Sequence, residues 1–183
     1  GGVPLESRLS RTPAPTGLWV SGLLSVIMSR GVVSRIGAPS SVLIAGAGQL
    51  GSRYLQGLAS CESPLQVFVY DPDSGSLQRS VERWREVGGD DSDHLVSYHS
   101  CLDDVEADLD LAIVATTADV RATVVEEVAE RFSVRMWVLE KLLGQCHLDL
   151  DRVVRAVGES ADAWVNTPTR MMPWYLEMRS LSE

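Results

Sequence analysis

The most informative run of residues in this sequence is Val42-Leu43-Ile44-Ala45-Gly46-Ala47-Gly48-Gln49-Leu50-Gly51. Four apolar residues lead into three glycines with the spacing G-x-G-x-x-G, and the next residues, 52–59, have the composition of a helix. A second apolar run, 67–70, ends in Asp71, about 20 residues after the last glycine. This order of strand, glycine turn, helix, strand and acid is the fingerprint of a dinucleotide-binding unit.

Each glycine of this turn has a different expected task. Gly46 allows the chain to turn tightly out of the strand, and Gly48, which has no Cβ, allows the backbone to approach a pyrophosphate. Gly51 allows the helix to pack close to the sheet. The phosphates are then expected at the helix N-terminus, beside Gln49 and Leu50, where free amide groups and the helix dipole favour an anion. A glycine turn that only packs the sheet is the structural alternative.

Asp71 indicates which dinucleotide this site prefers. A carboxylate at the end of the second strand accepts hydrogen bonds from the ribose hydroxyls of the adenosine, and it repels a 2′-phosphate. Residues 72–76 contain no arginine or lysine that would neutralise such a phosphate. The sequence therefore predicts NAD as the cofactor, in preference to NADP.

Two other enzyme classes share parts of this pattern. An S-adenosylmethionine methyltransferase has the same first glycine turn and the acid after the second strand, but the third glycine, Gly51, and the pair Glu140-Lys141 favour a dinucleotide. Short-chain dehydrogenases carry a Tyr-x-x-x-Lys pair on a helix, and the sequence contains no such pair.

The composition limits the classes of function. The 183 residues carry a net charge of −9, and 45% of them are hydrophobic, enough for the core of one domain. The acidic balance argues against a nucleic-acid surface, and no apolar stretch is long enough for a membrane span. The widely spaced Cys61, Cys101 and Cys146 predict reduced thiols and a cytoplasmic location. The histidines lack metal-ligand spacing, so we expect no metal site, and surface positions for His94 and His99.

The chain divides into three expected parts. Residues 1–40 are rich in proline, glycine, serine and arginine, which indicates a disordered or non-native N-terminal extension. Met28 is the expected natural start; a targeting segment is the alternative, because residues 18–28 are apolar, although no small-residue cleavage site follows them. Residues 41–168 are the expected dinucleotide-binding domain, and residues 169–183 are a linker.

After residue 41, strand and helix patterns alternate. The expected strands are 42–45, 66–70, 95–98, 109–115, 135–139 and 163–166, and the expected helices are 49–59, 75–87, 120–131 and 148–157. Alternation of this kind predicts an α/β fold with a doubly wound parallel sheet, in which ligands bind outside the carboxyl ends of the strands. The glycine turn, Asp71, Thr116-Thr117 and Glu140-Lys141 all lie at such ends.

Three segments, in this order and at this spacing, resemble the N-terminal domain of the Gfo/Idh/MocA family of oxidoreductases. They are the glycine turn 46–51, Ala112-Ile113-Val114-Ala115-Thr116-Thr117, and Val138-Leu139-Glu140-Lys141. The resemblance covers about residues 41–178, because 164–175 also looks like the strand and linker that lead into the second domain of that family. It implies a Rossmann fold and an NAD(P)-dependent dehydrogenase that acts on sugars, cyclitols or nucleotide-linked derivatives.

The resemblance also implies roles for single residues. Lys141 matches the lysine beside the nicotinamide that contacts the reacting hydroxyl of the substrate, where an ammonium stabilises a developing alkoxide or moves a proton. Glu140 matches the acid near the nicotinamide ribose. Thr116 and Thr117 match the loop that passes over the cofactor.

Two weaker candidates for substrate contact, Asn166 and Arg170, follow on the last strand and linker. The alternative is that Asn166 caps the strand and Arg170 is solvated.

The chain departs from the family pattern at Leu142, where the family has proline, and it does not contain the second domain, which supplies the substrate pocket and pairs subunits. We therefore expect the cofactor-binding half of a dehydrogenase, inactive by itself, whose full-length form binds a small-molecule substrate and pairs as a homo-oligomer. A stand-alone NAD(H)-binding module is the alternative.

Overall fold

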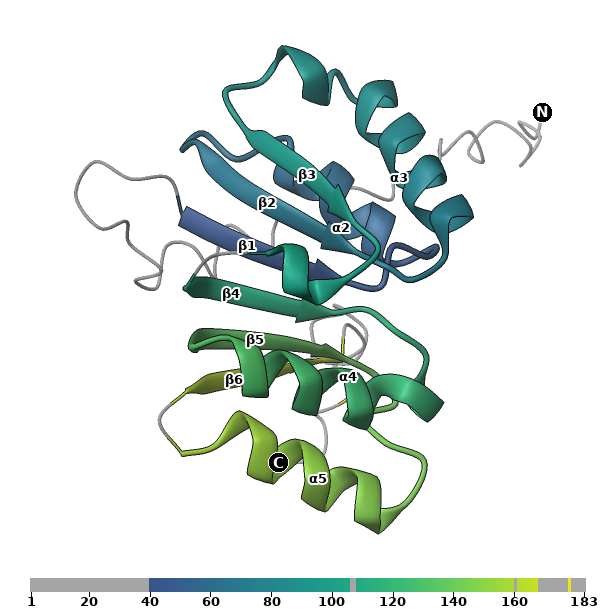
Figure 1. Cartoon of the computed structure of the whole chain (residues 1–183), viewed down its shortest axis with the longest axis vertical. Helices are drawn as coiled ribbons and strands as arrows, with labels where there is room; N and C mark the ends of the chain where they lie inside the picture. Colours follow the sequence, from purple (N-terminus) through teal and green to yellow (C-terminus); the bar gives the residue numbers. More distant parts are fainter. Residues whose placement is uncertain (1–39, 106–107, 160, 168–177, 179–183) are drawn as a thin grey trace, which may run out of the picture.

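The computed structural model of the protein describes residues 40–105, 108–159, 161–167 and 178, in which strands and helices alternate (Figure 1). The strands are β1 (Ser40–Ala45), β2 (Leu65–Tyr70), β3 (Leu95–His99), β4 (Leu109–Val114), β5 (Val134–Glu140) and β6 (Asp162–Asn166). The helices are α2 (Gly51–Leu58), α3 (Ser74–Glu86), α4 (Ala118–Arg131) and α5 (His147–Val157), with two 3₁₀ turns, η2 (Gly89–Asp91) and η3 (Leu102–Asp104).

Every expected strand and α-helix is confirmed, with ends that differ by no more than two residues. β1 begins at Ser40, which the expected N-terminal extension included. The remainder of that extension, and the linker residues 169–177 and 179–183, lie outside the described residues.

The strands form one six-stranded sheet in the order β3-β2-β1-β4-β5-β6, and all neighbours are parallel. β1 lies in the middle, where Ala45 pairs with Tyr70 on one side and with Val114 on the other. The chain runs outward from β1 through β2 and β3, then returns and runs outward the other way through β4, β5 and β6. This confirms the doubly wound fold and places its switch point, where ligands bind in such sheets, between β1 and β4.

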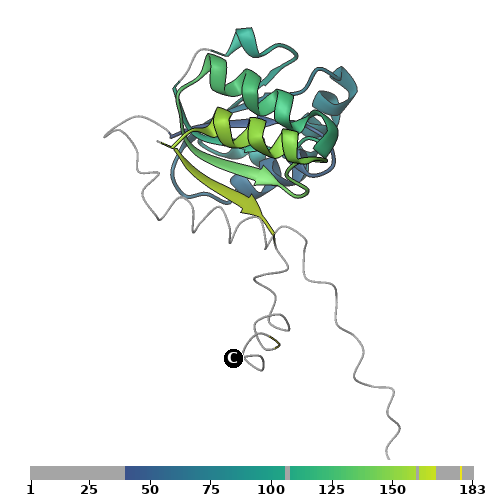
Figure 2. The same cartoon turned by 90° about the horizontal axis from the view of Figure 1, so that it is seen from below.

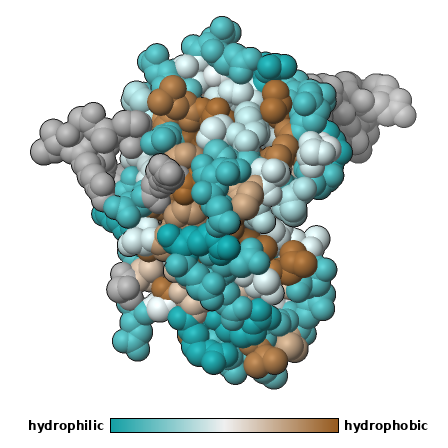
Figure 3. Space-filling model, in the orientation of Figure 1, coloured by the Kyte–Doolittle hydropathy of each residue, from teal (hydrophilic) through white to brown (hydrophobic). Residues whose placement is uncertain are grey.

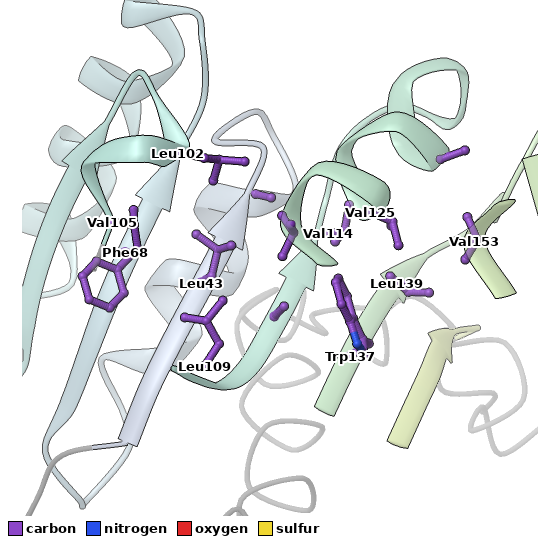
Figure 4. Packing of buried hydrophobic residues seen from close by; sticks show 14 residues of the cluster. Leu43, Phe68, Leu102, Val105, Leu109, Val114, Val125, Trp137, Leu139 and Val153 are labelled. Carbon is purple, nitrogen blue, oxygen red and sulfur yellow. The ribbon is translucent and has the colours of Figure 1, made fainter. Parts of the chain in front are cut away.

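Helices cover both faces of the sheet and enclose two apolar cores. On one face, Tyr54 and Leu55 of α2 and Trp84 of α3 pack on Val42, Ile44 and other strand residues. On the other face, η3, α4 and α5 pack on a second cluster, in which Trp137 is the largest side chain (Figures 2 and 4). Both faces are buried, which is why β1 and β4 have no alternation of polar and apolar residues.

The outer surface of the helical layer is mostly polar. Hydrophilic residues cover most of the face seen in Figure 3, and the apolar residues on it form separate patches. Among the described helices, none combines the length and the apolar character that crossing a membrane requires.

A short turn precedes the edge strand β3. Residues 88–93 contain η2 and bury Gly89 against the ring of Trp84, while Asp90, Asp91 and Asp93 are exposed. The sequence predicts surface positions for His94 and His99, and the structure places both at half-buried positions, so this prediction holds only in part. The His94 ring lies 6.2 Å from that of Trp84, and its Nδ1 accepts a hydrogen bond from the Leu65 amide at 3.1 Å. These contacts join β3 to the start of β2.

We expect acid to weaken the fold through His94. Burial lowers the pKa of this imidazole more than the neighbouring Asp93 raises it. Protonation of Nδ1 would also remove the lone pair that accepts the Leu65 amide. A folded-state pKa below the unfolded value of 6.5 means that the stabilisation is present above about pH 6.5 and is lost as the pH falls through the folded pKa.

Urea unfolding of the wild type and of His94→Asn at several pH values between 7 and 5 tests this. The asparagine oxygen can accept the same amide but does not titrate, so His94→Asn should lose less stability across this interval. His147→Asn, at an exposed position, is the matched control and should follow the wild type. If the free energy of unfolding depended on pH in the same way for all three proteins, protonation of His94 would not be the cause of the loss of stability in acid.

Candidate dinucleotide-binding site

The carboxyl ends of β1, β2 and β4 meet at Gly46. This residue has φ +97°, a backbone conformation that side chains disfavour, and its amide donates to the Tyr70 carbonyl at 2.8 Å. A Cβ on Gly46 would lie 3.0 Å from the Ala115 carbonyl carbon and from the Thr116 amide nitrogen. The tight turn out of β1 therefore requires glycine, and it places the β4–α4 loop directly against the turn.

Gly51 and Gly48 differ in what surrounds them. A Cβ on Gly51 would lie 1.7 Å from the Gly46 carbonyl oxygen, so only glycine lets α2 begin this close to β1. A Cβ on Gly48 would meet nothing within 4 Å, and the backbone there does not have positive φ. The fold requires Gly51 but not Gly48, and the space above Gly48 is open to another molecule.

The turn also presents free hydrogen-bond donors. The amides of residues 48–51 donate no hydrogen bond to any described residue, and Leu50 caps α2 without a side-chain acceptor. From α3, Arg83 donates to the Gln49 carbonyl at 3.2 Å, to the Gln49 side-chain oxygen at 2.5 Å and to the Ser52 hydroxyl. Unpaired amides at the positive end of a helix, with a guanidinium beside them, fit a phosphate group.

Asp71 has a structural task that its position in the sequence did not indicate. Its Oδ2 accepts the Ala47 amide at 2.7 Å, and its Oδ1 accepts the Asp73 amide at 2.9 Å. The buried Ser80 hydroxyl donates to the Ala47 carbonyl at 3.0 Å. Asp71 therefore holds the glycine turn from the end of β2, and each of its oxygens keeps a lone pair for a further donor. Its contact with a ribose stays a prediction.

Glu140, at the end of β5, is buried and only 2% exposed. Its Oε1 accepts a hydrogen bond from the Tyr54 hydroxyl of α2 and another from the Asn166 amide of β6 at 2.6 Å. Asn166 also donates to the Tyr54 oxygen at 2.6 Å. Burial and the adjoining carboxylate raise the pKa of Tyr54, so this phenol stays a donor. Direct contact of Glu140 with a ribose stays a prediction.

Arg121 of α4 links the loops that follow β4 and β5. Its side chain is 2% exposed and donates to the Thr116 carbonyl and to the Leu142 carbonyl. Burial lowers its pKa, which the negative charges of Glu140 and Asp119 partly offset. The Thr116 hydroxyl is buried and has no partner among the described residues.

Thr117 is exposed at the start of α4, and its hydroxyl lowers the pKa of the Asp119 carboxyl by donating to it. Lys141 is exposed and directly follows the last residue of β5. The bond between Lys141 and Leu142 is a cis peptide.

The predicted residues lie along one edge in the order of the strands. Asp71 follows β2, the glycine turn follows β1, the threonines follow β4, Lys141 follows β5, and Asn166 ends β6. β4 separates β1 from β5, so Lys141 lies about 10 Å from the glycine turn along the sheet. Arg170 lies outside the described residues.

Other predictions concern residues away from this edge. Cys61, Cys101 and Cys146 are free thiols, and the cytoplasmic location inferred from them stays a prediction. Within the described ranges, no three His, Cys, Asp or Glu side chains come together in a way that could hold a metal ion.

Comparison with solved structures identifies the fold, although no protein-family model and no curated protein sequence matches the chain. The chain is similar to the WlbA dehydrogenase from Bordetella pertussis in complex with NADH and UDP-GlcNAcA, with a TM-score of 0.59 at 18% identity over 79% of this chain and 42% of that one. It is similar to myo-inositol 2-dehydrogenase from Lactobacillus plantarum, with a TM-score of 0.60 at 14% identity over 79% of this chain and 41% of that one. It is also similar to an oxidoreductase from Desulfitobacterium hafniense described as NADPH-dependent, with a TM-score of 0.60 at 15% identity over 79% and 39%.

The chain has a Rossmann fold of the kind found in these dehydrogenases. The resemblance to Gfo/Idh/MocA oxidoreductases that the motifs indicated is confirmed at the level of the fold. The chain spans about two fifths of the length of the solved proteins that it matches.

The sequence did not single out Tyr54, Arg83 or Arg121 as parts of the site. Tyr54 and Arg121 have the helical spacing of core positions, and the sequence has no signal that separates a buried arginine from a solvated one. Only the strand order brings these side chains to the same edge.

The different surroundings of two glycines give a stability prediction. Gly51→Ala forces a methyl group into the Gly46 carbonyl, and we expect the free energy of unfolding to fall by at least ~2 kcal/mol. Gly48→Ala adds the same atoms in open space and should change it by less than ~0.5 kcal/mol. Urea denaturation compares the two proteins, and equal stabilities would mean that α2 does not approach β1 this closely.

Proposed function

We propose that this chain is the NAD(H)-binding part of an oxidoreductase of the Gfo/Idh/MocA type. The reaction is hydride transfer between nicotinamide and a hydroxyl of a sugar, cyclitol or nucleotide-sugar substrate. The observation that carries the proposal is that an open glycine turn with unpaired amides shares one sheet edge with Lys141, two strands away. The similar structures include an NADH complex with a nucleotide sugar and a cyclitol dehydrogenase, which support this substrate class.

The cofactor would lie across the edge of the sheet. The pyrophosphate would sit above Gly48, bound by the free amides of residues 48–51 with Arg83 close by. The adenosine ribose would reach Asp71 on the β2 side. The nicotinamide end would pass Thr116 and Thr117 towards β5. The unpaired Thr116 hydroxyl is suited to a cofactor contact, because a buried hydroxyl without a partner is unfavourable.

Lys141 is the residue that we propose for catalysis. Bound nicotinamide supplies the carbon that accepts or donates the hydride. The Lys141 amine would hold the oxygen of the reacting hydroxyl and take up or return its proton. Lys141 is the only lysine among the sixteen basic residues of the chain. A guanidinium supplies charge but does not give up its proton, so a proton-transfer role accounts for lysine at this position.

Asn166 is a weaker candidate for substrate binding than its position on β6 indicated. Its amide is already engaged by Tyr54 and Glu140, and Arg170 lies outside the described residues. We therefore assign the substrate contact on this chain to Lys141 first.

Calorimetric titration with NADH and NADPH tests the binding proposal. We expect NADH to bind more tightly, because the Asp71 carboxylate repels a 2′-phosphate. Asp71→Asn keeps an acceptor for the Ala47 amide and removes the charge, so it should narrow the difference between the cofactors. Gly48→Val should abolish NADH binding, because its branched side chain would occupy the open space proposed for the pyrophosphate. Gly48→Ala adds a smaller group in the same space and should keep the fold. Equal or tighter binding of NADPH would refute the preference, and unchanged NADH affinity in Gly48→Val would place the phosphates elsewhere.

Lys141 variants separate a dehydrogenase from a stand-alone binding module. In a form of the protein that turns over substrate, Lys141→Ala should lower kcat by roughly 100-fold or more, a typical contribution of proton transfer. Lys141→Arg should be nearly as slow, because charge alone does not replace the proton carrier. NADH affinity should stay the same in both variants. Full activity of Lys141→Ala would remove the residue from the mechanism, and NADH binding without any turnover would favour the binding module.

A further inference from the structure

Lys141 is exposed, yet the residues on both sides of it are hydrogen-bonded to buried side chains. Glu140 before it is held by Tyr54 and Asn166, and Leu142 after it is held through its carbonyl by Arg121. A lysine that only solvates a strand end needs no such arrangement. The anchors come from α2, β6 and α4, three elements that are far apart in the sequence.

The anchor at Glu140 is strong because the carboxylate is buried. A carboxylate with 2% exposure is unfavourable unless donors surround it, and hydrogen bonds to a charged group are stronger than those between neutral groups. The Tyr54 hydroxyl and the Asn166 amide are those donors. Tyr54 is fully buried in α2, the helix that begins at the glycine turn, so this bond also fixes that helix to the end of β5.

The anchor at Leu142 acts on the backbone. The Arg121 guanidinium bridges the Leu142 and Thr116 carbonyls and thereby sets the spacing of the β5 and β4 loops. Leu142 contributes little packing of its own, because it is 73% exposed. Leu143 packs against the second core cluster and the Gln145 amide donates to Asp149 further along the loop, so the arginine is the anchor nearest to Lys141 on this side.

We propose that Tyr54 and Arg121 are positioning residues for Lys141. They fix the residues on either side of Lys141, so that its amine projects from a rigid segment of backbone beside the proposed cofactor site. Chemistry at a site of this kind requires placement to about 0.5 Å, which an unanchored loop does not give. The catalytic meaning of the inference rests on the proposed function, but the rigidity of Lys141 can be measured without cofactor or substrate.

The single lysine makes this test direct. Protein grown with ¹⁵N-lysine gives one backbone amide signal, that of Lys141, and its relaxation yields an order parameter. For the wild type without cofactor we expect about 0.85, the value of rigid backbone. In Tyr54→Phe and in Arg121→Met we expect it to fall below about 0.6, the range of flexible backbone.

Two matched controls remove similar groups elsewhere. Tyr98→Phe deletes a buried hydroxyl that has no partner among the described residues, and Arg131→Met removes an arginine from the same helix, α4. Both should leave the Lys141 signal as in the wild type. The free energy of unfolding is measured in parallel, because a merely structural role would lower it without changing the order parameter. If Tyr54→Phe does not fold, Asn166→Ala removes a donor from the same carboxylate and should give the same loss of order.

The inference is overturned if the Lys141 amide is already flexible in the wild type, or if it stays rigid when an anchor is removed. NADH titration of the same labelled protein is scored separately. Failure to bind NADH would contradict the proposed function, but it would not contradict the inference that Tyr54 and Arg121 keep the Lys141 backbone rigid.

Discussion

The geometry of the edge depends on one close approach, that of α2 to the end of β1. No atom of a side chain fits between Gly51 and the Gly46 carbonyl, where a Cβ would lie 1.7 Å from the oxygen. This contact fixes the direction in which the amides of the turn point. It also places Tyr54, one turn into α2, within reach of Glu140. The expected phosphate site and the strand that carries Lys141 are therefore connected through one short helix.

Two sets of hydrogen-bonded polar groups are buried under this edge, one around Glu140 and one around Arg121. Glu140 and Arg121 carry opposite charges at 2% exposure, and each holds a different part of the loop that follows β5. Burying two charges costs free energy that their hydrogen bonds only partly offset, and the Arg121 Nε has no partner among the described residues, so these groups fix a conformation more than they add stability. The distribution of these bonds agrees with that view, because they end on loops and strand ends.

Much of the fold could be predicted from particular residues. The uninterrupted apolar runs of β1 and β4 indicate strands covered on both faces, and the spacing of the three glycines indicates the turn between β1 and α2. Differences arise where exposure depends on distant packing. The sequence predicts a surface position for His94, but this side chain is half-buried, because its ring lies near Trp84 and accepts the Leu65 amide.

The sequence by itself determined the order of the elements and which segments end at the carboxyl edge, because apolar periodicity and glycine spacing are local properties. It also predicted a catalytic role for Lys141 and a cofactor contact for Asp71, two residues that directly follow strands. Only the tertiary structure decided how these residues are held. The order β1-β4-β5-β6 brings Tyr54, Arg121 and Asn166 around Glu140 and Leu142, and the residues that hydrogen-bond to each other here are 21 to 112 positions apart in the chain. Hydrogen bonds between residues so distant in the chain produce no periodic pattern in the sequence. For this reason the sequence alone could not predict them, and only the folded structure reveals them.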